Sequence, residues 1–596
     1  MSLEAYRIFG PLFYVELTGS YDLKFNRNPD KFLKYDLVNE SSEPLPLYES
    51  VNVPKYIMYL TLLPIVSRLA EIKQLAYTYH LIPGGAHTRY EHSMGVMLRC
   101  ERLLDKLSKI VNEKCKNSAL KIDNDEKIVL QIAALLHDIG HSSWGHALDG
   151  ITGHVVDLLR ETLDNYLFSP RKLDTTVALY LLLYNEQLTK ALQTCSKEIK
   201  AEALSKHLNK VIAQIIMEEE PPFFSELETD KNLMIKVHLL TTVLGSYRGR
   251  GGVNADRLDW FIRDAHHTNL KVKLDPSNAQ KFEDFLRSNI ENNFAIDIEN
   301  CEFAYISDKI FNKLMEDLRE VVYTSIYEGA ERALIDSWLT RLAFTAIDVI
   351  YKIGEQISSP STTTRAIMGF LLMSDYEMKE CTDKILTLAK QNINLLGAPA
   401  PSTEFISNST DLLCIFDHAK YIMHSLTSRP FKTKYSPKMD LHFEYLDFEL
   451  IGKTLITITA DNMGTLIERA YNTCQKSEVC KLAMIFQNFL VAPRLDPITA
   501  CQIPIMESNM RSKFKDVNIH VLINYYLFRK LDDYFLKEVK DLISLKEILT
   551  KQDKLGKIPF IFILADKTKE EKVIEIFEEA CAAVLSYFMN CFAFYQ

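Results

Sequence analysis

The stretch LLHDIGHSSWGHALDG, residues 135–150, holds three histidines and two aspartates in sixteen positions. The whole chain of 596 residues has only 15 histidines, so this concentration calls for an explanation. The stretch follows the apolar run VLQIAALL, which predicts that His137 and Asp138 lie near the end of a buried helix that frays at Gly140. At such a helix end, the adjacent imidazole and carboxylate can both reach one ion.

Two other segments share this polar character within otherwise apolar helical sequence. Upstream, PGGAHTRYEHSMGV (83–96) places Arg89 and His92 three residues apart, and therefore on one helical face. Downstream, NADRLDWFIRDAHHTNL (254–270) has a polar stripe at helical spacing, where a packing face would be apolar. The stripe consists of Asp256, Trp260, Asp264 and His267. Three such segments predict convergence on one pocket.

The composition is that of an ordinary globular protein, with 47% apolar and 25% charged residues. A net charge of −10 disfavours a general nucleic-acid coat, and we interpret the basic runs at 429–438 and 511–516 as solvated faces. The 11 cysteines form no CxxC pair, which favours free thiols in a reducing compartment. With neither a secretory signal nor an apolar run of about 20 residues, the sequence predicts a cytoplasmic protein that does not enter membranes.

The pattern along the chain predicts a mainly α fold with a smaller mixed α/β or α+β domain at the C-terminus. Apolar residues recur at three- and four-residue spacing up to about residue 390, whereas strand-like runs occupy 442–450, 453–460, 517–528 and 558–565. We therefore predict an N-terminal arm with short strands, a helical domain, a linker and a mixed C-terminal domain of unknown role, at residues 1–53, 54–395, 396–430 and 431–596.

The order H…HD…D, here His92, His137–Asp138 and Asp256, resembles the signature of HD-domain metal-dependent phosphohydrolases. Four motifs extend the resemblance to the deoxynucleoside triphosphate triphosphohydrolases: IKQL (72–75), PGGAHTRYEHSMGV (83–96), HDIGHSSWGHALD (137–149) and DRLDWFIRDAHH (256–267). Within that family the chain is most similar to the branch of the SAM-and-HD-domain enzyme, although no SAM domain is apparent. The resemblance covers roughly residues 55–345.

The resemblance implies a metal site and a reaction. The metal ligands would be His92, His137, Asp138 and Asp256. Two imidazoles and two carboxylates suit a borderline divalent ion, and Mg, Mn, Fe, Co, Ni and Zn all stay open. In the resembling enzymes, metal-bound water attacks the α-phosphorus of a deoxynucleoside triphosphate, releasing the deoxynucleoside and tripolyphosphate.

Carried over by motif, His146 is the expected general acid, Asp149 would orient it, and His141 would contact the α-phosphate. The remaining expected contacts are with substrate and comprise Gln74, Leu75, Arg89, His154, Arg257, Trp260, Asp264 and Tyr327. Gln74 and Leu75 match the pair that senses the sugar 3′-hydroxyl and excludes a 2′-hydroxyl. His154 is matched only by shortening a loop. Tyr323 and Ala330 stand where the family has histidine and lysine, which lowers the positive charge at the phosphate end.

Two other functions stay open. The same metal chemistry would serve a phosphodiesterase or nuclease acting on other nucleotides or on single-stranded nucleic acid. A non-catalytic nucleotide-sensing or nucleic-acid-binding module is the third, although it has no chemical need for Arg89 and His146. The expected partner is a deoxynucleoside triphosphate; a homo-oligomer stays open, and nucleic acid is open but not favoured.

Overall fold

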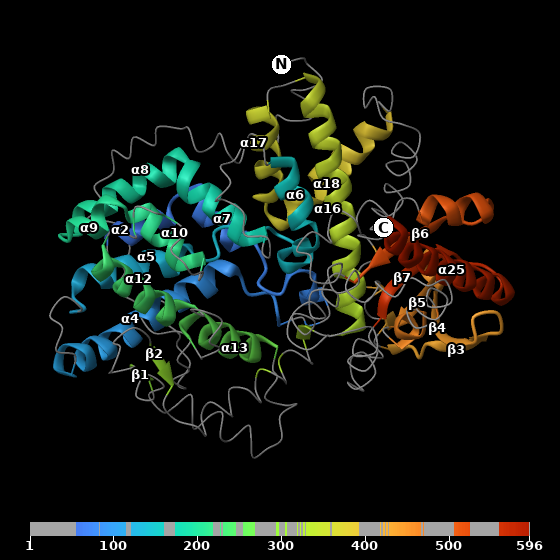
Figure 1. Cartoon of the computed structure of the whole chain (residues 1–596), viewed down its shortest axis with the longest axis horizontal. Coiled ribbons are helices and arrows are strands. Elements are labelled where there is room, and N and C mark those ends of the chain that lie inside the picture. Colours follow the sequence, from blue (N-terminus) through green and yellow to red (C-terminus); the bar gives the residue numbers. More distant parts are fainter. Residues whose placement is uncertain are drawn as a thin grey trace.

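The structure of the chain is a computed structural model (Figure 1). It describes residues 55–80, 82, 84–114, 121–159, 173–217, 224, 227, 230–245, 254–268, 294–296, 304–306, 319, 322, 326–327, 329–357, 360–391, 418, 421–422, 425–426, 428–459, 461–466, 469, 506–524 and 559–594. The predicted N-terminal arm and most of the predicted linker lie outside these residues. The predicted domain boundaries therefore stay a prediction.

Helices dominate the first two thirds of the chain, as the apolar spacing predicts. In the N-terminal part they are α2 (Lys55–Thr61), α3 (Pro64–Ser67), η3 (Arg68–Glu71), η4 (Ala76–His80), α4 (Arg89–Lys114), α5 (Asn124–Leu136), η6 (Gly145–Ile151) and α6 (Thr152–Leu159). They continue as α7 (Leu173–Tyr184), α8 (Glu186–Cys195), η8 (Ser196–Glu198), α9 (Glu202–Lys206), α10 (Leu208–Met217), α12 (Lys231–Leu244) and α13 (Ala255–His267). After a short antiparallel hairpin, β1 (Phe294–Ile296) and β2 (Ala304–Ile306), come α16 (Ala330–Ile357), α17 (Pro360–Leu371) and α18 (Asp375–Gln391).

Helix α5 shows how local sequence places the HD dipeptide. Asp123 caps its N-terminus by accepting a hydrogen bond from the N–H of Asp125 at 2.9 Å, while Glu126 accepts from the N–H of Asp123 at 2.8 Å. This reciprocal capping box fixes where the helix begins. The helix is buried along most of its length and ends at Leu136, so His137 is the C-terminal cap. The predicted position of His137 at the end of a buried helix is confirmed.

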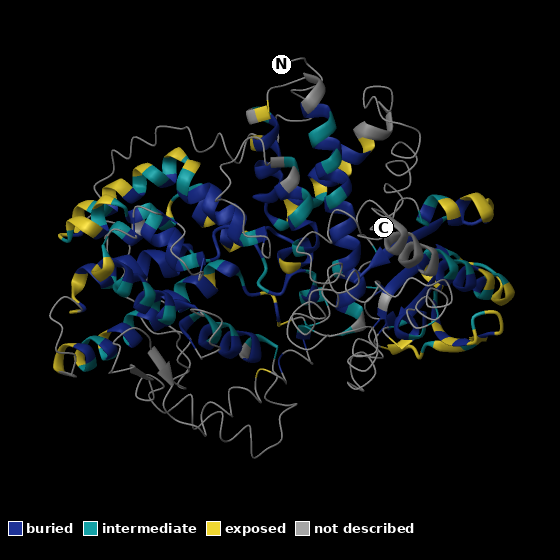
Figure 2. Ribbon diagram, in the orientation of Figure 1, coloured by how far each residue is buried: buried dark blue, intermediate teal, exposed yellow. Residues whose placement is uncertain are grey.

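Helices α4, α5 and α13 lie side by side in the helical body (Figure 1). Figure 2 shows that their inner faces are buried. Gly95 allows the close approach of α4 to α13, because a Cβ at this position would lie 2.2 Å from Oδ1 of Asp259 and 2.2 Å from Nη2 of Arg263. The three helices carry the three polar motifs of the sequence, so their packing brings those motifs together.

The C-terminal part contains a five-stranded antiparallel sheet in the order β3-β4-β5-β7-β6. Its strands are β3 (Lys432–Ser436), β4 (Leu441–Phe448), β5 (Lys453–Thr459), β6 (Ile519–Ile523) and β7 (Pro559–Asp566), followed by the helix α25 (Glu570–Phe594). Phe443 of β4 stacks on Phe577 of α25 with ring centroids 4.0 Å apart. The predicted mixed architecture is confirmed, and the antiparallel pairing makes it α+β.

The sequence did not predict strand β3, which lies in the basic run 429–438. Its burial pattern is mostly exposed, and its lysines pair with acidic residues of neighbouring elements. Lys432 lies 2.6 Å from Asp447, and Lys434 pairs with Glu570. This part of the basic run is therefore a solvated face, as predicted, that also forms the edge of the sheet.

Helix α16 connects the helical body to the sheet. Arg341 of α16 donates to Oε1 of Glu507 at 2.9 Å and to the carbonyl of Val521 in β6 at 2.8 Å. One residue earlier, Thr340 donates to the carbonyl of Ala147 in η6. The apolar core is continuous from the helices into the inner face of the sheet. None of the described helices is long and apolar enough to span a membrane.

Candidate metal centre and active site

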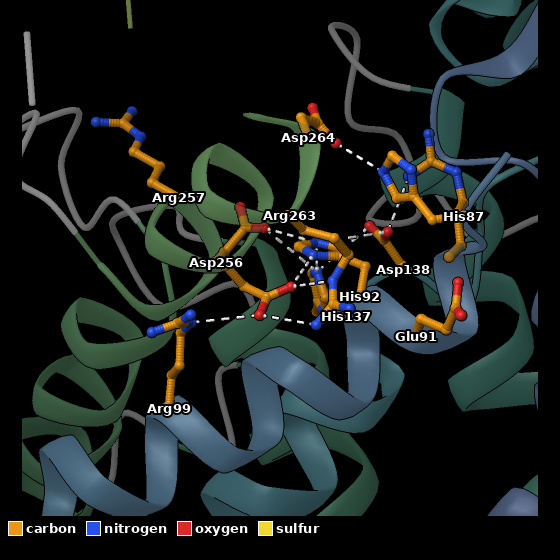
Figure 3. A network of polar contacts seen from close by, with 12 residues as sticks. His87, Glu91, His92, Arg99, His137, Asp138, Asp256, Arg257, Arg263 and Asp264 are labelled. Carbon is orange, nitrogen blue, oxygen red and sulfur yellow. Dashed lines mark hydrogen bonds and ion pairs between the residues drawn. The ribbon is translucent and has the colours of Figure 1, made fainter. Parts of the chain in front are cut away.

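Four side chains, from α4, from the turn that follows α5 and from α13, form the candidate metal centre (Figure 3). The Nε2 atoms of His92 and His137 lie 3.3 Å apart and approach Oδ1 of Asp256 to 3.0 Å and 3.5 Å, respectively. Asp138 lies beside them, with Oδ1 3.4 Å from Nε2 of His137 and Oδ2 3.9 Å from Nε2 of His92. The ligand atoms of His92, His137 and Asp256 all lie within 4.8 Å of one another. This mixed nitrogen and oxygen set suits a borderline divalent cation.

The orientation of His92 is fixed by a carboxylate behind it. Its Nδ1 lies 2.9 Å from Oδ2 of Asp259, which leaves Nε2 directed at the metal centre. Asp259 is buried and also accepts hydrogen bonds from Arg263 at 2.8 Å and from Arg99 at 3.3 Å. Burial alone would raise the pKa of Asp259, but Arg263 and His92 outweigh it and hold the pKa well below the usual range. Asp259 therefore stays ionised and holds the imidazole in place.

The charges around the centre favour a bound cation. Burial lowers the pKa of His92, but hydrogen bonds to Asp256 and Asp259 outweigh burial and raise that pKa to about 10. Burial likewise opposes ionisation of Asp138, yet the neighbouring histidines and arginine hold its pKa well below the usual range. Carboxylates that attract a proton onto an adjacent imidazole provide the negative potential that a divalent cation would neutralise.

Arg89 opens helix α4 and points at the centre. Its Nη1 donates to Oδ2 of Asp138 at 2.8 Å, and the residue is only 3% exposed. Its Nε is buried and has no hydrogen-bond partner among the described residues. Gly145 leaves room for the guanidinium, since a Cβ there would lie 3.3 Å from Nη2 of Arg89 and the backbone φ is +56°. Arg89 therefore has a further donor for an anion at this site.

His141 lies between two carboxylates. Its Nε2 is 3.3 Å from Oδ1 of Asp138 and 3.2 Å from Oδ2 of Asp174, the second residue of α7. Burial, reinforced by the charge of Arg89, lowers the pKa of His141 to about 3, so the imidazole is neutral. A neutral imidazole can still donate one hydrogen bond to a phosphate oxygen or a carboxylate. Asp174 thus holds the position beside His141 that the sequence left unassigned.

His146 and Asp149 form a second histidine–carboxylate pair in η6. Nδ1 of His146 lies 3.1 Å from Oδ2 of Asp149, and the side chain of His146 is 48% exposed. The ring of His146 meets that of His141 edge-on, with centroids 5.0 Å apart. The carboxylate fixes the Nδ1–H tautomer, so Nε2 is the nitrogen available to a substrate.

The expected sugar-sensing pair lies on a turn next to this region. Leu75 is fully buried, and Oε1 of Gln74 is buried without a hydrogen-bond partner among the described residues. The N–H of Gln74 donates to the carbonyl of His87 at 3.0 Å, which ties the turn to the segment leading into α4. The structure therefore places Gln74 and Leu75 close in space to Arg89.

The aromatic side of the expected pocket also converges. The hydroxyl of Tyr327 donates to Oδ2 of Asp264 at 2.5 Å, and Trp260 meets Tyr327 edge-on with centroids 5.9 Å apart. Oδ1 of Asp264 lies 2.8 Å from Nε2 of His87, whose ring stacks on His267 at 4.4 Å. Asp264 therefore binds both His87 and Tyr327, and His87 is a pocket residue that the sequence analysis did not select.

Two expected substrate contacts are less well placed. Arg257 lies on α13 next to Asp256, but Figure 3 shows its guanidinium pointing away from the metal centre. His154 lies on α6, where its ring packs against Phe344 of α16 with centroids 4.3 Å apart. Tyr323 lies outside the described residues. The roles of Arg257 and His154 stay predictions.

The sequence analysis did not select Asp259 or Asp174, and the two differ in whether the sequence pattern could have indicated them. Asp259 follows Asp256 by three residues in DRLDWFIRD, so helical spacing alone puts both on one face of α13. Asp174 follows His141 by 33 positions, outside every motif, and only the packing of α7 brings it to the site. The sequence offered a signal for Asp259 but none for Asp174.

Residues 89–231 match the family model of the HD domain. The chain is 25% identical over 320 residues to "Deoxynucleoside triphosphate triphosphohydrolase SAMHD1" of Bos taurus, a match covering 51% of this chain and 47% of the relative. The corresponding human protein is 23% identical over 361 residues, covering 58% of this chain and 53% of the relative.

A viral relative, "Putative HD domain-containing protein L394" of Acanthamoeba polyphaga mimivirus, is 24% identical over 303 residues, covering 49% of this chain and 54% of the relative. The chain spans about half the length of the curated relatives it matches. The family match begins at Arg89 and includes His92, His137 and Asp138. The resemblance seen in the motifs is thus confirmed: this chain contains an HD domain and is related to the deoxynucleoside triphosphate triphosphohydrolases.

Proposed function

We propose that this protein is a metal-dependent phosphohydrolase that converts deoxynucleoside triphosphates into deoxynucleoside and tripolyphosphate. One observation carries the proposal: the His146–Asp149 pair lies next to the candidate metal ligands. His141 links the two, because it contacts Asp138 at 3.3 Å and its ring lies 5.0 Å from that of His146. The names of the relatives support the choice of substrate.

The proposed residues divide the work of hydrolysis. A divalent ion, when bound by His92, His137, Asp138 and Asp256, lowers the pKa of water and polarises a phosphoryl oxygen. Arg89 donates a hydrogen bond to the α-phosphate, and His141 contacts the same phosphate. His146, its Nδ1–H held by Asp149 at 3.1 Å, delivers a proton from Nε2 to the 5′-oxygen of the departing deoxynucleoside.

The sugar and base would occupy the side of the pocket lined by the Gln74 turn and the aromatic cluster. In this proposal the Oε1 of Gln74, which has no hydrogen-bond partner among the described residues, accepts a hydrogen bond from the 3′-hydroxyl, and Leu75 crowds the 2′ position. Asp264, Trp260 and Tyr327, which contact one another, would line the rest of the sugar and base site. In such a site, the preference for deoxyribose over ribose depends on the position of Leu75.

A product assay tests the proposal. The protein is incubated with each dNTP and each NTP in the presence of Mg²⁺, Mn²⁺, Co²⁺ or Ni²⁺, and nucleosides are resolved from nucleotides. We expect deoxynucleoside and tripolyphosphate from wild type and none from Asp138→Ala. Loss of a general acid typically costs about 10²–10⁴-fold, so His146→Ala should fall within that range. His442→Ala, at an exposed position of β4, is the matched control and should keep full activity.

Other outcomes would replace the proposed reaction. Release of a nucleoside monophosphate would move the cleaved bond from the 5′-oxygen side to the far side of the α-phosphorus. Cleavage of cyclic nucleotides or single-stranded oligonucleotides, without dNTP turnover, would establish the phosphodiesterase or nuclease alternative. Stoichiometric nucleotide binding without turnover of any of these compounds would establish a sensing module.

A further inference from the structure

One edge of the turn that carries Gln74 and Leu75 pairs with the segment before α4. An isolated antiparallel bridge joins Lys73 to Thr88, and the N–H of Gln74 donates to the carbonyl of His87 at 3.0 Å. Successive N–H groups of an extended chain point to opposite edges. The N–H of Lys73 therefore faces away from this pairing and needs another acceptor.

Asp375 supplies that acceptor. Its Oδ2 accepts a hydrogen bond from the N–H of Lys73 at 3.2 Å, across 302 positions of the sequence. Asp375 is the first residue of α18, whose N-terminus is fixed by a hydrogen bond from the N–H of Ser374 to Glu377 at 3.0 Å. Helix α18 packs against α16 (Figure 1). The turn is thus held between the start of α4 on one edge and a rigid helix end on the other.

The turn is strained immediately after Leu75. Ala76 has φ of +45°, in the left-handed region that a residue with a Cβ avoids, and its N–H donates to the carbonyl of Lys73 at 3.1 Å. Backbone strain of this kind persists only where the surrounding structure holds it in place. Both backbone polar groups of Lys73 are therefore engaged, the carbonyl by the strained residue and the N–H by Asp375.

The position of this turn determines where the two residues proposed to contact the sugar lie. Leu75 packs against Gly85 so closely that a Cβ on Gly85 would lie 2.8 Å from Cδ1 of Leu75. The Oε1 of Gln74 is buried and has no hydrogen-bond partner among the described residues. A small relaxation of the turn would open space at Leu75 and displace the amide of Gln74.

The Asp375 carboxyl acts here through an oxygen atom rather than through its charge. Burial raises the pKa of Asp375 to about 7, although Lys73 and Arg89 oppose this effect. The other oxygen, Oδ1, is buried without a hydrogen-bond partner among the described residues. An asparagine, which keeps a carbonyl oxygen of the same reach, is therefore a close substitute.

We propose that Asp375 is a positioning residue that sets the preference for deoxyribose over ribose by anchoring the Lys73–Ala76 turn. The inference rests on the proposed function, in which Gln74 and Leu75 contact the sugar. Asp375 itself touches neither substrate nor metal. It acts through the backbone of Lys73, which places Leu75 against the 2′ position of the sugar.

The test compares Asp375→Ala, Asp375→Asn and the neighbouring control Tyr376→Phe. Tyr376 is 70% exposed and its hydroxyl donates to Glu380, one turn further along α18 and away from Lys73. For each protein we would measure kcat/KM for dGTP, GTP, dATP and ATP, and the equilibrium dissociation constants of the same four nucleotides. Amide hydrogen exchange at residues 73–76 reports the anchor directly and needs no activity.

We expect Asp375→Ala to speed exchange at residues 73–76 and to lower the deoxy-to-ribo ratio of kcat/KM at least tenfold. Asp375→Asn should restore most of the ratio, and Tyr376→Phe should match wild type. Faster exchange with an unchanged ratio would overturn the inference, as would an Asp375→Asn variant as unselective as Asp375→Ala.

Failure of the proposed function has a different signature. A wild-type protein that binds deoxynucleotides preferentially but hydrolyses none would refute the proposed reaction. In that case the deoxy-to-ribo ratio of dissociation constants still decides whether Asp375 sets selectivity. A wild-type protein that binds both sugars equally would overturn the selectivity inference as well.

Discussion

Replacing Asp259 with asparagine tests how much the carboxylate that orients His92 contributes to metal binding. The carboxylate holds Nδ1 of His92 at 2.9 Å and is itself held by Arg263 at 2.8 Å and Arg99 at 3.3 Å. Asparagine keeps an oxygen for the imidazole but removes the negative charge that makes His92 a stronger ligand. Loss of such an outer partner typically weakens metal binding about 10–100-fold.

This loss converts into a measurable change in unfolding free energy. A ligand at 100 times its dissociation constant stabilises the folded state by about 2.7 kcal/mol. At the same metal concentration, a site weakened about 10-fold gains about 1.4 kcal/mol, and one weakened about 100-fold gains about 0.4 kcal/mol. The metal-induced gain should therefore fall from about 2.7 to between 0.4 and 1.4 kcal/mol in Asp259→Asn.

The assay is denaturant unfolding of wild type and Asp259→Asn, each with and without Mn²⁺ at a fixed concentration. Subtracting the metal-free value removes the cost of leaving Arg99 and Arg263 without their carboxylate, so only the metal-dependent part remains. Asp264→Asn is the matched control, because Asp264 lies on the same helix but bonds to His87 and Tyr327. An Asp259→Asn protein that gains as much from Mn²⁺ as wild type would refute the reasoning.

Three further perturbations probe other parts of the structure. Glu507→Gln leaves the buried Arg341 without its carboxylate, so denaturant unfolding should show a loss of about 3–5 kcal/mol, and a loss below about 1 kcal/mol would contradict this. Gly140→Ala would place a Cβ 1.9 Å from the carbonyl oxygen of Asp174, so overpacking should cost about 1–3 kcal/mol or more by the same assay. The pKa of Asp375 is raised to about 7 by burial, so the native state holds this proton more tightly than the unfolded chain, in which the pKa is about 3.9. The resulting stability is present below about pH 4 and is lost as the pH rises through about 7; Asp375→Asn should remove that dependence from unfolding curves measured across this range.

The candidate metal ligands could be predicted because each lies in a motif whose local structure is simple. His137 and Asp138 follow an apolar run that can only be a buried helix, and that helix indeed ends at Leu136. His92 and Asp256 lie in the first turns of α4 and α13. Polar residues at the ends of apolar helices indicate that they have polar partners. Four such residues in the order of a known motif favour a shared metal site over four unrelated contacts.

Strand β3 was missed for a physical reason. A strand with one buried face alternates apolar and polar residues, but the segment KTKYS is exposed at most positions and follows no such pattern. It is an edge strand, and lysines at an edge protect a sheet from pairing with other chains. The exposed lysines that prevent this edge from pairing with other chains therefore also remove the apolar–polar alternation by which a strand is predicted.

Asp174, Asp375 and Glu507 illustrate a different limit. Each is a single acidic residue whose partner is distant in sequence: 33 positions for His141, 302 for Lys73 and 166 for Arg341. A single aspartate or glutamate in a sequence is most often exposed to solvent. The residues that flank it in the sequence do not indicate that a distant helix will bury it. Only the packing of α7, α18 and the C-terminal sheet reveals these contacts.

Helix α16 joins the C-terminal sheet to the segment that carries His146 through two such long-range contacts. Thr340 donates to the carbonyl of Ala147, the residue after His146, while the adjacent Arg341 is buried against Glu507. Because a helix is stiff along its axis, a shift at Arg341 also displaces Thr340 and with it the loop that carries the proposed acid. The C-terminal sheet therefore contributes to the position of His146, although none of its described residues is among the candidate metal ligands. If so, Glu507→Gln should lower kcat more than it raises KM at temperatures where the variant is still folded, and equal changes in both would show that the sheet only stabilises the fold.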